Sequence, residues 1–199
     1  MSTPSDSLDQ AYFDRVYEAN ADPWSFATSP YEYQKYKATV DALPRAHYAN
    51  AFEIGCSIGV LTQMLADRCD QLLAVDASAL PLQTAREKLA AYPNVAIQQM
   101  SIPGEFPDDT FDLVILSEVG YYLSMPDLEH ARQLLVDSLR PGGHLLLVHW
   151  TPFVHDYPLT GDQVHDSFLQ EARPGGPLNH LTNQRESTYR LDLFEKRPH

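Results

Sequence analysis

The feature that most constrains the fold is an alternation of short apolar stretches with amphipathic ones between residues 50 and 150. The apolar stretches predict strands at 51–54, 72–76, 95–100, 111–117 and 144–150. Between these strands apolar residues recur at helical spacing, which predicts helices at 59–67, 79–91 and 126–139. Strands and helices that alternate in this way form a parallel sheet with helices on both faces, so the sequence predicts an α/β fold.

The segments on either side of this pattern have a different character. Residues 12–36 contain eight aromatic side chains, and Pro23 and Pro30 divide this part into helices near 10–19 and 31–43. We therefore interpret residues 1–45 as an N-terminal helical aromatic segment and residues 46–199 as the core. Toward the C-terminus the sequence predicts a helix at 162–172 and an alternating strand at 189–196, antiparallel to the others.

Charge and composition restrict the class of partner. The 199 residues carry 14 Lys plus Arg and 27 Asp plus Glu, a formal net charge of −13. This acidity argues against nucleic acid and anionic membranes as partners, and it favours a neutral or cationic small molecule. No apolar run approaches the roughly 18 residues of a membrane span, and the polar start differs from a secretory signal. We therefore expect a cytoplasmic protein; the sequence leaves the oligomeric state open.

The turn after the first predicted strand has the spacing of a cofactor site. It is formed by Gly55, Cys56, Ser57, Ile58 and Gly59. A pyrophosphate dinucleotide site requires Gly-x-Gly-x-x-Gly, whereas here Glu53 precedes the first glycine and Ser57 replaces the middle one. A carboxylate at this position suits a ligand with hydroxyl or ammonium donors. The second strand ends at Asp76, which is placed to accept hydrogen bonds from both hydroxyls of a ribose.

Four segments resemble successive motifs of class I S-adenosylmethionine (SAM)-dependent methyltransferases: EIGCSIG, LLAVDAS, FDLVILSEVGYYL and LRPGGHLLLVHW. Within that superfamily the chain is most similar to the nodulation protein S (NodS) group, through DPWSFATSPYEYQKYK and the EVGYYL run at 118–123. The resemblance covers about residues 12–150. It implies a Rossmann-like fold and methyl transfer from SAM, which leaves S-adenosylhomocysteine. In the nodulation protein the acceptor is the free amine of a deacetylated chitooligosaccharide, so an amine acceptor is implied, for example an amino sugar.

The resemblance also implies which residues meet the cofactor. Asp76 and Ala77 would hold the ribose and flank the adenine, while Ser117 would lie beside the methionine part. The family usually directs an aspartate from the third strand to the adenine amino group, and this chain has Ser101 and Ile102 there instead. The complete expected set is Glu53, Gly55, Cys56, Ser57, Gly59, Asp76, Ala77, Ser101, Ile102 and Ser117, with Trp24 from the N-terminal segment.

Candidates for catalysis lie at the ends of the fourth and fifth strands. A neutral amine needs mainly desolvation and alignment, whereas a hydroxyl acceptor needs a general base. Glu118 could hold an amine or the ammonium of SAM, or it could simply begin a helix. His149 could accept a proton or be structural. Trp24 and its aromatic neighbours could form a lid over the SAM sulfonium, or they could only cover a core.

Other functions remain open from the sequence. His155, Asp156, Asp162 and His165 have no regular ligand spacing, so we expect no metal. The alternatives to an N-methyltransferase are an O-methyltransferase that uses His149 as its base and a SAM-binding module without turnover. A nicotinamide-dependent reductase is a further alternative, against which the missing Gly-x-Gly-x-x-Gly counts.

Overall fold

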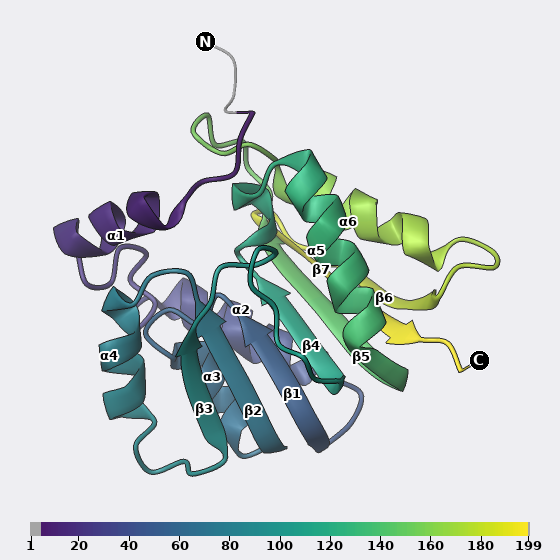
Figure 1. Cartoon of the computed structure of the whole chain (residues 1–199), viewed down its shortest axis with the longest axis horizontal. Coiled ribbons are helices and arrows are strands. Elements are labelled where there is room, and N and C mark those ends of the chain that lie inside the picture. Colours follow the sequence, from purple (N-terminus) through teal and green to yellow (C-terminus); the bar gives the residue numbers. More distant parts are fainter. Residues whose placement is uncertain (1–4, 199) are drawn as a thin grey trace.

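The sheet of the computed structural model, which describes residues 5–198, has seven strands in the order β3-β2-β1-β4-β5-β7-β6 (Figure 1). The parallel strands are β1 (Tyr48–Ile54), β2 (Cys69–Asp76), β3 (Val95–Gln99), β4 (Phe111–Ser117) and β5 (Leu139–Trp150). At one edge β7 (Tyr189–Lys196) runs antiparallel to β5, and β6 (Leu178–Arg185) runs antiparallel to β7. The predicted mostly parallel sheet with an antiparallel C-terminal strand is confirmed.

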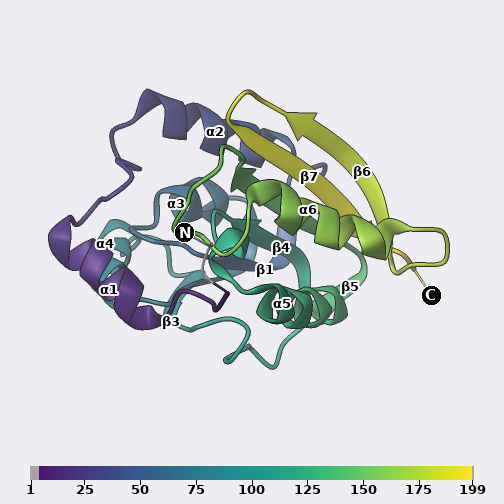
Figure 2. The same cartoon turned by 90° about the horizontal axis from the view of Figure 1, so that it is seen from above.

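Helices cover both faces of the sheet. Successive strand residues point to opposite sides, so each face presents apolar side chains that helices bury. Phe52 and Val114 belong to the same apolar cluster as residues of α5 (Met125–Ser138) and α6 (Gly161–Leu169). Ala51 and Leu113 belong to a second cluster with residues of α2 (Pro30–Asp41) and α3 (Val60–Ala66). Seen from above, α2 and α3 lie on one side of the sheet and α5 on the other (Figure 2).

Short polar residues determine where several helices begin. The side chain of each N-terminal capping residue accepts a hydrogen bond from a backbone N–H of the first turn, which is worth about 1 kcal/mol. These residues are Asp9 before α1 (Gln10–Ala19), Ser29 before α2, Ser124 before α5 and Thr160 before α6. Proline in the first turn of α2 and of α5 favours the same starts. An N–H in the first turn has no acceptor within the helix, so proline loses no hydrogen bond there.

The N-terminal segment covers the carboxyl ends of the parallel strands. Helix α1 lies beyond those ends and next to α4 (Leu80–Lys88), as Figure 1 shows. Ahead of α1, the Leu8 N–H donates to the Tyr122 carbonyl in the turn η1 (Gly120–Tyr122), at 2.8 Å. Ligands of open α/β sheets bind at this edge. In the described part of the chain, no helix combines the length and apolar character needed to cross a membrane.

Three elements differ from the prediction. The sequence does not predict β6, because most of its side chains are exposed and it has no run of apolar residues. Strand β5 starts at Leu139, earlier than the strand predicted at 144–150. The helix predicted at 162–172 is α6 followed by a separate 3-10 turn, η2 (Gln170–Ala172).

Candidate active site

A cavity of about 660 Å³ lies at the carboxyl ends of the parallel strands. Its wall combines the core with the N-terminal segment, because Phe13, Tyr17 and Trp24 line it together with Gly55 and Asp76. Cavities of this size are typical of sites for cofactors and other small molecules. The topology of the sheet and the position of the N-terminal segment therefore converge on one candidate site.

The turn between β1 and α3 forms the floor of this cavity. Gly55 adopts φ of +83°, and an added Cβ there would lie 2.2 Å from Val119 Cγ2. Gly59 adopts φ of +77° and packs against Ala85 of α4, where an added Cβ would lie 3.2 Å from the alanine Cβ. Both positions require glycine, because any side chain would be strained and would clash. Gly55 therefore brings bare backbone to the cavity, while Gly59 lets α3 pack on its neighbour.

Asp76 is held at the end of β2 by backbone donors. Its carboxylate accepts hydrogen bonds from the N–H groups of Ser57 and Ser78, each at 3.0 Å. Burial raises the pKa of Asp76 to about 6, while these N–H groups act in the opposite direction. The Tyr17 hydroxyl donates to Ser57 Oγ at 2.8 Å, so α1 is anchored directly to the turn.

Glu53 lies beneath the turn and does not line the cavity. Its side chain is almost fully buried, and burial raises its pKa to about 7. Within residues 5–198, Glu53 Oε2 has no hydrogen-bond partner. A buried carboxylate oxygen without a donor is costly, and a ligand ammonium or hydroxyl would relieve that cost.

Lys35, Glu32 and Glu118 form an ion cluster in the wall over β4 and β5. Lys35 Nζ lies 2.6 Å from Glu118 Oε1 and 2.9 Å from Glu32 Oε2, and the lysine side chain is only 3% exposed. Although burial acts in the opposite direction, the two carboxylates raise the pKa of Lys35, which therefore stays charged. Glu118 Oε2 accepts from the Tyr121 hydroxyl at 2.6 Å and from the Trp150 N–H at 2.9 Å. The cluster ties α2 to the ends of β4 and β5.

The cavity wall is strongly acidic. Among the described residues that line it, five are carboxylates and one is a lysine: Asp9, Glu32, Asp76, Glu118, Asp127 and Lys35. With the lysine already paired, the remaining negative charge favours a ligand that carries a cation.

Aromatic rings pack the N-terminal segment onto this site. Trp24 makes an edge contact with Tyr17 at 5.7 Å between centroids and stacks on Phe26 at 5.4 Å. Phe13 makes an edge contact with Tyr122 of η1 at 5.0 Å. The segment therefore packs two groups of aromatic rings over the site, and Phe13, Tyr17, Trp24 and Phe26 line the cavity.

His149 lies outside the cavity, which argues against the expectation that it acts as the proton acceptor for a substrate. It is fully buried behind η1, and its Nε2 accepts a hydrogen bond from the Gly120 N–H at 3.0 Å. Its Nδ1 lies 3.1 Å from His165 Nε2. With both ring nitrogens in hydrogen bonds and no exposed surface, His149 cannot reach a ligand in the cavity. Burial and the neighbouring His165 lower its pKa well below the usual value.

The other expected site residues divide into two groups. Those that line the cavity are Trp24, Gly55, Ser57, Asp76, Ala77, Ser101, Ile102, Ser117 and Glu118. Those that do not are Glu53, Cys56, Gly59 and His149. Cys56 is buried with Ala74 and Leu82 instead, because its side chain points into the core between the sheet and α4.

Sequence reasoning missed Lys35, Glu32, Phe13 and Tyr17, all of which line the cavity. The sequence identifies Phe13 and Tyr17 only as members of the aromatic segment, and the local signal of Glu32 and Lys35 is their three-residue spacing, which is also common on exposed helix faces. Of the four residues considered as metal ligands, Asp162 pairs with Arg185 and Arg190, while His165 pairs with Asp192.

Comparison with known proteins identifies one family. The family described as nodulation protein S (NodS) matches residues 10–150. Nodulation protein S of Bradyrhizobium diazoefficiens is 31% identical over 127 residues, which are 63% of this chain and 61% of that protein. The chain matches between about half and three fifths of the length of the curated nodulation proteins.

Solved structures agree with the fold. A candidate methyltransferase from Pseudomonas syringae is 34% identical, with a TM-score of 0.73 over 83% of this chain and 99% of that one. The N-methyltransferase NodS from Bradyrhizobium japonicum, in complex with S-adenosylhomocysteine, gives a TM-score of 0.81 at 23% identity. That match covers 94% of this chain and 97% of the other.

Proposed function

Because the chain belongs to the nodulation protein S family of class I SAM-dependent methyltransferases, we propose that it transfers a methyl group from SAM to a small-molecule amine. The observation that carries the amine is the acidic cavity wall, with five carboxylates and one lysine among its described lining residues. A protonated amine is attracted to such a wall, whereas a neutral hydroxyl gains little from it.

The residues at the ends of β1 and β2 fit the cofactor. The Asp76 carboxylate is available to ribose hydroxyls, and the bare backbone at Gly55 permits close approach. Bound SAM supplies a methyl group on a sulfonium centre. Phe13, Tyr17 and Trp24 exclude water from that group and offer ring faces to the cation.

The Lys35 cluster provides the acceptor end of the reaction. Three hydrogen-bond donors fix the position of the Glu118 carboxylate. A carboxylate fixed in this way can orient the acceptor. Glu32 is the better proton acceptor, because burial raises its pKa despite the neighbouring Lys35. The acceptor's ammonium gives one proton to Glu32, and the freed lone pair attacks the methyl carbon while sulfur keeps the electrons of the broken bond. The nitrogen gains the methyl group and becomes the methylated ammonium.

An amino sugar with a free amine, such as a deacetylated chitooligosaccharide, is the acceptor that we propose. Family membership supports it, as does the cavity, which offers carboxylates to the amine and to neighbouring hydroxyls. The same carboxylates would also accept other small cationic amines.

Two chitooligosaccharides test this function: one fully N-acetylated, the other with its terminal amine freed. We expect label from methyl-labelled SAM only on the freed amine, and calorimetry should show S-adenosylhomocysteine binding. Labelling of both would point to a hydroxyl acceptor. Labelling of neither the sugar nor a panel of small amines, with the cofactor product still bound, would leave a binding module without turnover.

A further inference from the structure

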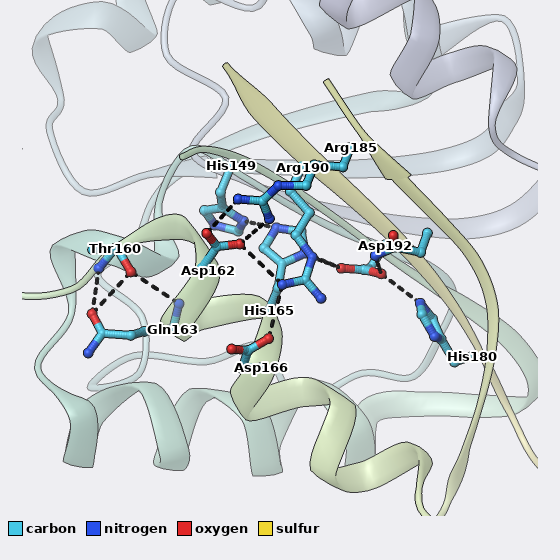
Figure 3. A network of polar contacts seen from close by, with 11 residues as sticks. His149, Thr160, Asp162, Gln163, His165, Asp166, His180, Arg185, Arg190 and Asp192 are labelled. Atoms are coloured by element: carbon cyan, nitrogen blue, oxygen red, sulfur yellow. Dashed lines mark hydrogen bonds and ion pairs between the residues drawn. The ribbon is translucent and has the colours of Figure 1, made fainter. Parts of the chain in front are cut away.

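A buried polar chain lies behind the cavity wall, outside the site described above (Figure 3). It runs from His149 on β5 through His165 on α6 to Asp192 on β7, and all three side chains have no exposed surface. His149 Nδ1 lies 3.1 Å from His165 Nε2, and His165 Nδ1 lies 2.6 Å from Asp192 Oδ2. The chain joins three elements that are far apart in the sequence.

The Gly120 N–H determines which atom donates and which accepts in each hydrogen bond of this polar chain. The Gly120 N–H can only donate, so His149 Nε2 carries no proton and His149 Nδ1 donates to His165. His165 Nδ1 in turn donates to the Asp192 carboxylate. Burial lowers the pKa values of both histidines, which favours the neutral rings that this order needs. Each histidine therefore has one defined tautomer.

The outer end of the chain is held rigidly. Asp192 also accepts from His180 at 2.6 Å, from Asn183 at 2.7 Å and from Arg190 at 2.7 Å. Arg190 continues to Asp162 and Asp166 on α6 (Figure 3). A carboxylate with this many donors has little freedom to move, so Asp192 is a fixed reference point for His165 and His149.

The inner end of the chain meets the turn that carries the acceptor side of the cavity. His149 accepts from Gly120, and the ring of Tyr121 makes an edge contact with the His149 ring at 5.4 Å. An added Cβ on Gly120 would lie 2.6 Å from Val164 Cγ1 and 3.0 Å from His149 Nε2. The turn is thus pressed closely against His149, while Tyr121 and Glu118 line the cavity.

Glu118 needs such support because its backbone is strained. Its φ is +58°, which is rarely adopted by residues other than glycine, asparagine and aspartate and costs of the order of 1 kcal/mol. The Glu118 carboxylate accepts hydrogen bonds from the Tyr121 hydroxyl and from the N–H of Trp150, the residue immediately after His149. Two groups that restrain Glu118, the Trp150 N–H and the Tyr121 hydroxyl, therefore lie next to His149.

We propose that the chain Asp192–His165–His149 is a positioning device that fixes the turn with Glu118 and Tyr121, and thereby the geometry of the methyl acceptor. The role in transfer rests on the proposed function. His149 is then a positioning residue, which acts through Gly120, Tyr121 and Trp150 and never touches the substrate. It affects how the acceptor is held, while the cofactor end at Gly55 and Asp76 is independent of it.

A pair of variants on one strand tests this role. His149→Phe keeps a buried ring and loses both hydrogen bonds. His144→Phe is the matched control, since His144 is also buried on β5 and hydrogen-bonded, but to Tyr48 rather than to Gly120 of the turn. We expect His149→Phe to lower kcat/KM for the acceptor at least about tenfold and to leave the Kd of S-adenosylhomocysteine within about threefold. His144→Phe should leave both within about twofold.

Rescue by a conservative variant separates positioning from simple loss of stability. The side-chain oxygen of His149→Gln can accept from the Gly120 N–H, so we expect this variant to recover much of the acceptor kcat/KM. If His149→Phe loses stability like His144→Phe but keeps wild-type acceptor kinetics, the chain only stabilises the fold and the proposal is wrong.

A second measurement needs no turnover, and its first part needs only the wild-type protein. Nitrogen NMR of the wild-type imidazoles should show His149 with an unprotonated Nε2 and a protonated Nδ1. In His149→Gln, the amides of Gly120 and Trp150 should keep slow hydrogen exchange. A protonated Nε2 in the wild type would overturn the proposal. These observations do not depend on methyl transfer, so a failure of the proposed function would be recognised separately, by absent S-adenosylhomocysteine binding or absent transfer in the wild type.

Discussion

Asp76 and Glu53 end or nearly end neighbouring strands, yet they have different surroundings. Asp76 lines the cavity and already accepts two backbone hydrogen bonds, whereas Glu53 lies below the turn with an unpartnered oxygen. Residue identity and spacing place both carboxylates near the cofactor. Only the packing of α3 and α4 determines which of them faces the cavity.

The first residue-scale prediction concerns Asp76. Asp76→Ala should weaken S-adenosylhomocysteine binding by about 1.5–3 kcal/mol, because hydrogen bonds to a charged group are lost. Calorimetry measures this change. Asp70→Ala is the control, since Asp70 is on the same strand but is exposed and pairs with His47. Unchanged affinity in Asp76→Ala would mean that the ribose is held elsewhere.

The second concerns Glu32. Glu32→Gln keeps the shape of the side chain but cannot take a proton, so kcat for an amine acceptor should fall about 100-fold. The Kd of S-adenosylhomocysteine should stay near the wild-type value, because Glu32 belongs to the Lys35 cluster rather than to the floor of the cavity. Asp41→Asn is the control, on the same helix and in an exposed pair with Lys37. Full kcat in Glu32→Gln would exclude this carboxylate as the proton acceptor.

At the scale of elements, the structure depends on how α1 and η1 cover the ends of the strands. Several contacts hold α1 and the residues before it to the core, among them the Leu8 N–H on Tyr122, the Phe13 ring on Tyr122 and the Tyr17 hydroxyl on Ser57. Each is weak, so α1 should be among the less stable parts of the molecule. Division of the chain at residue 45 into an aromatic segment and a core stays a prediction.

A third prediction follows for α1. Phe13→Ala removes the ring on Tyr122 and part of the cavity wall, so S-adenosylhomocysteine binding should weaken by about 1–2 kcal/mol. Hydrogen exchange across Gln10–Ala19 should be faster than in the wild type, and added ligand should slow it. Arg15→Ala, on the exposed face of the same helix, should change neither quantity. If ligand left exchange in α1 unaltered, the segment would not be a lid.

At the scale of the whole molecule, the free energy of unfolding depends on pH, because carboxylates beside the cavity are buried in a chain with net charge −13. The pKa of Glu53 is about 7 in the folded protein, above the 4.5 of an ordinary glutamate. The folded state therefore holds the proton more tightly than the unfolded state. This contribution to the free energy of unfolding is complete below about pH 4.5 and is lost as the pH rises through about 7.

The fourth prediction tests this linkage. In urea unfolding between pH 5 and pH 8, wild type should lose about 2–3 kcal/mol relative to Glu53→Gln, which cannot ionise. Glu129→Gln, exposed on α5, controls for the change in net charge and should parallel the wild type. A constant difference between wild type and Glu53→Gln across this range would show that Glu53 titrates normally.

Local sequence patterns predict the α/β sheet, its strand–helix alternation and the turn from Gly55 to Gly59, and they carry the family resemblance. These features are local: a strand needs a few apolar residues, and a tight turn needs glycine at fixed positions. The sequence also named nine residues that line the cavity, because strand ends in a parallel sheet meet at one edge.

Tertiary structure decided what depends on residues distant in the sequence. A hydrogen bond to Glu118, 83 residues away, holds the Lys35 ammonium in the cavity wall. No local pattern in the sequence distinguishes Lys35 from a lysine in solvent. His149 and Glu118 both lie near strand ends, yet only Glu118 faces the cavity, because α6 brings His165 against the histidine from behind. Whether a polar side chain meets ligand or core depends on the element packed against it, and that packing is set by the whole chain.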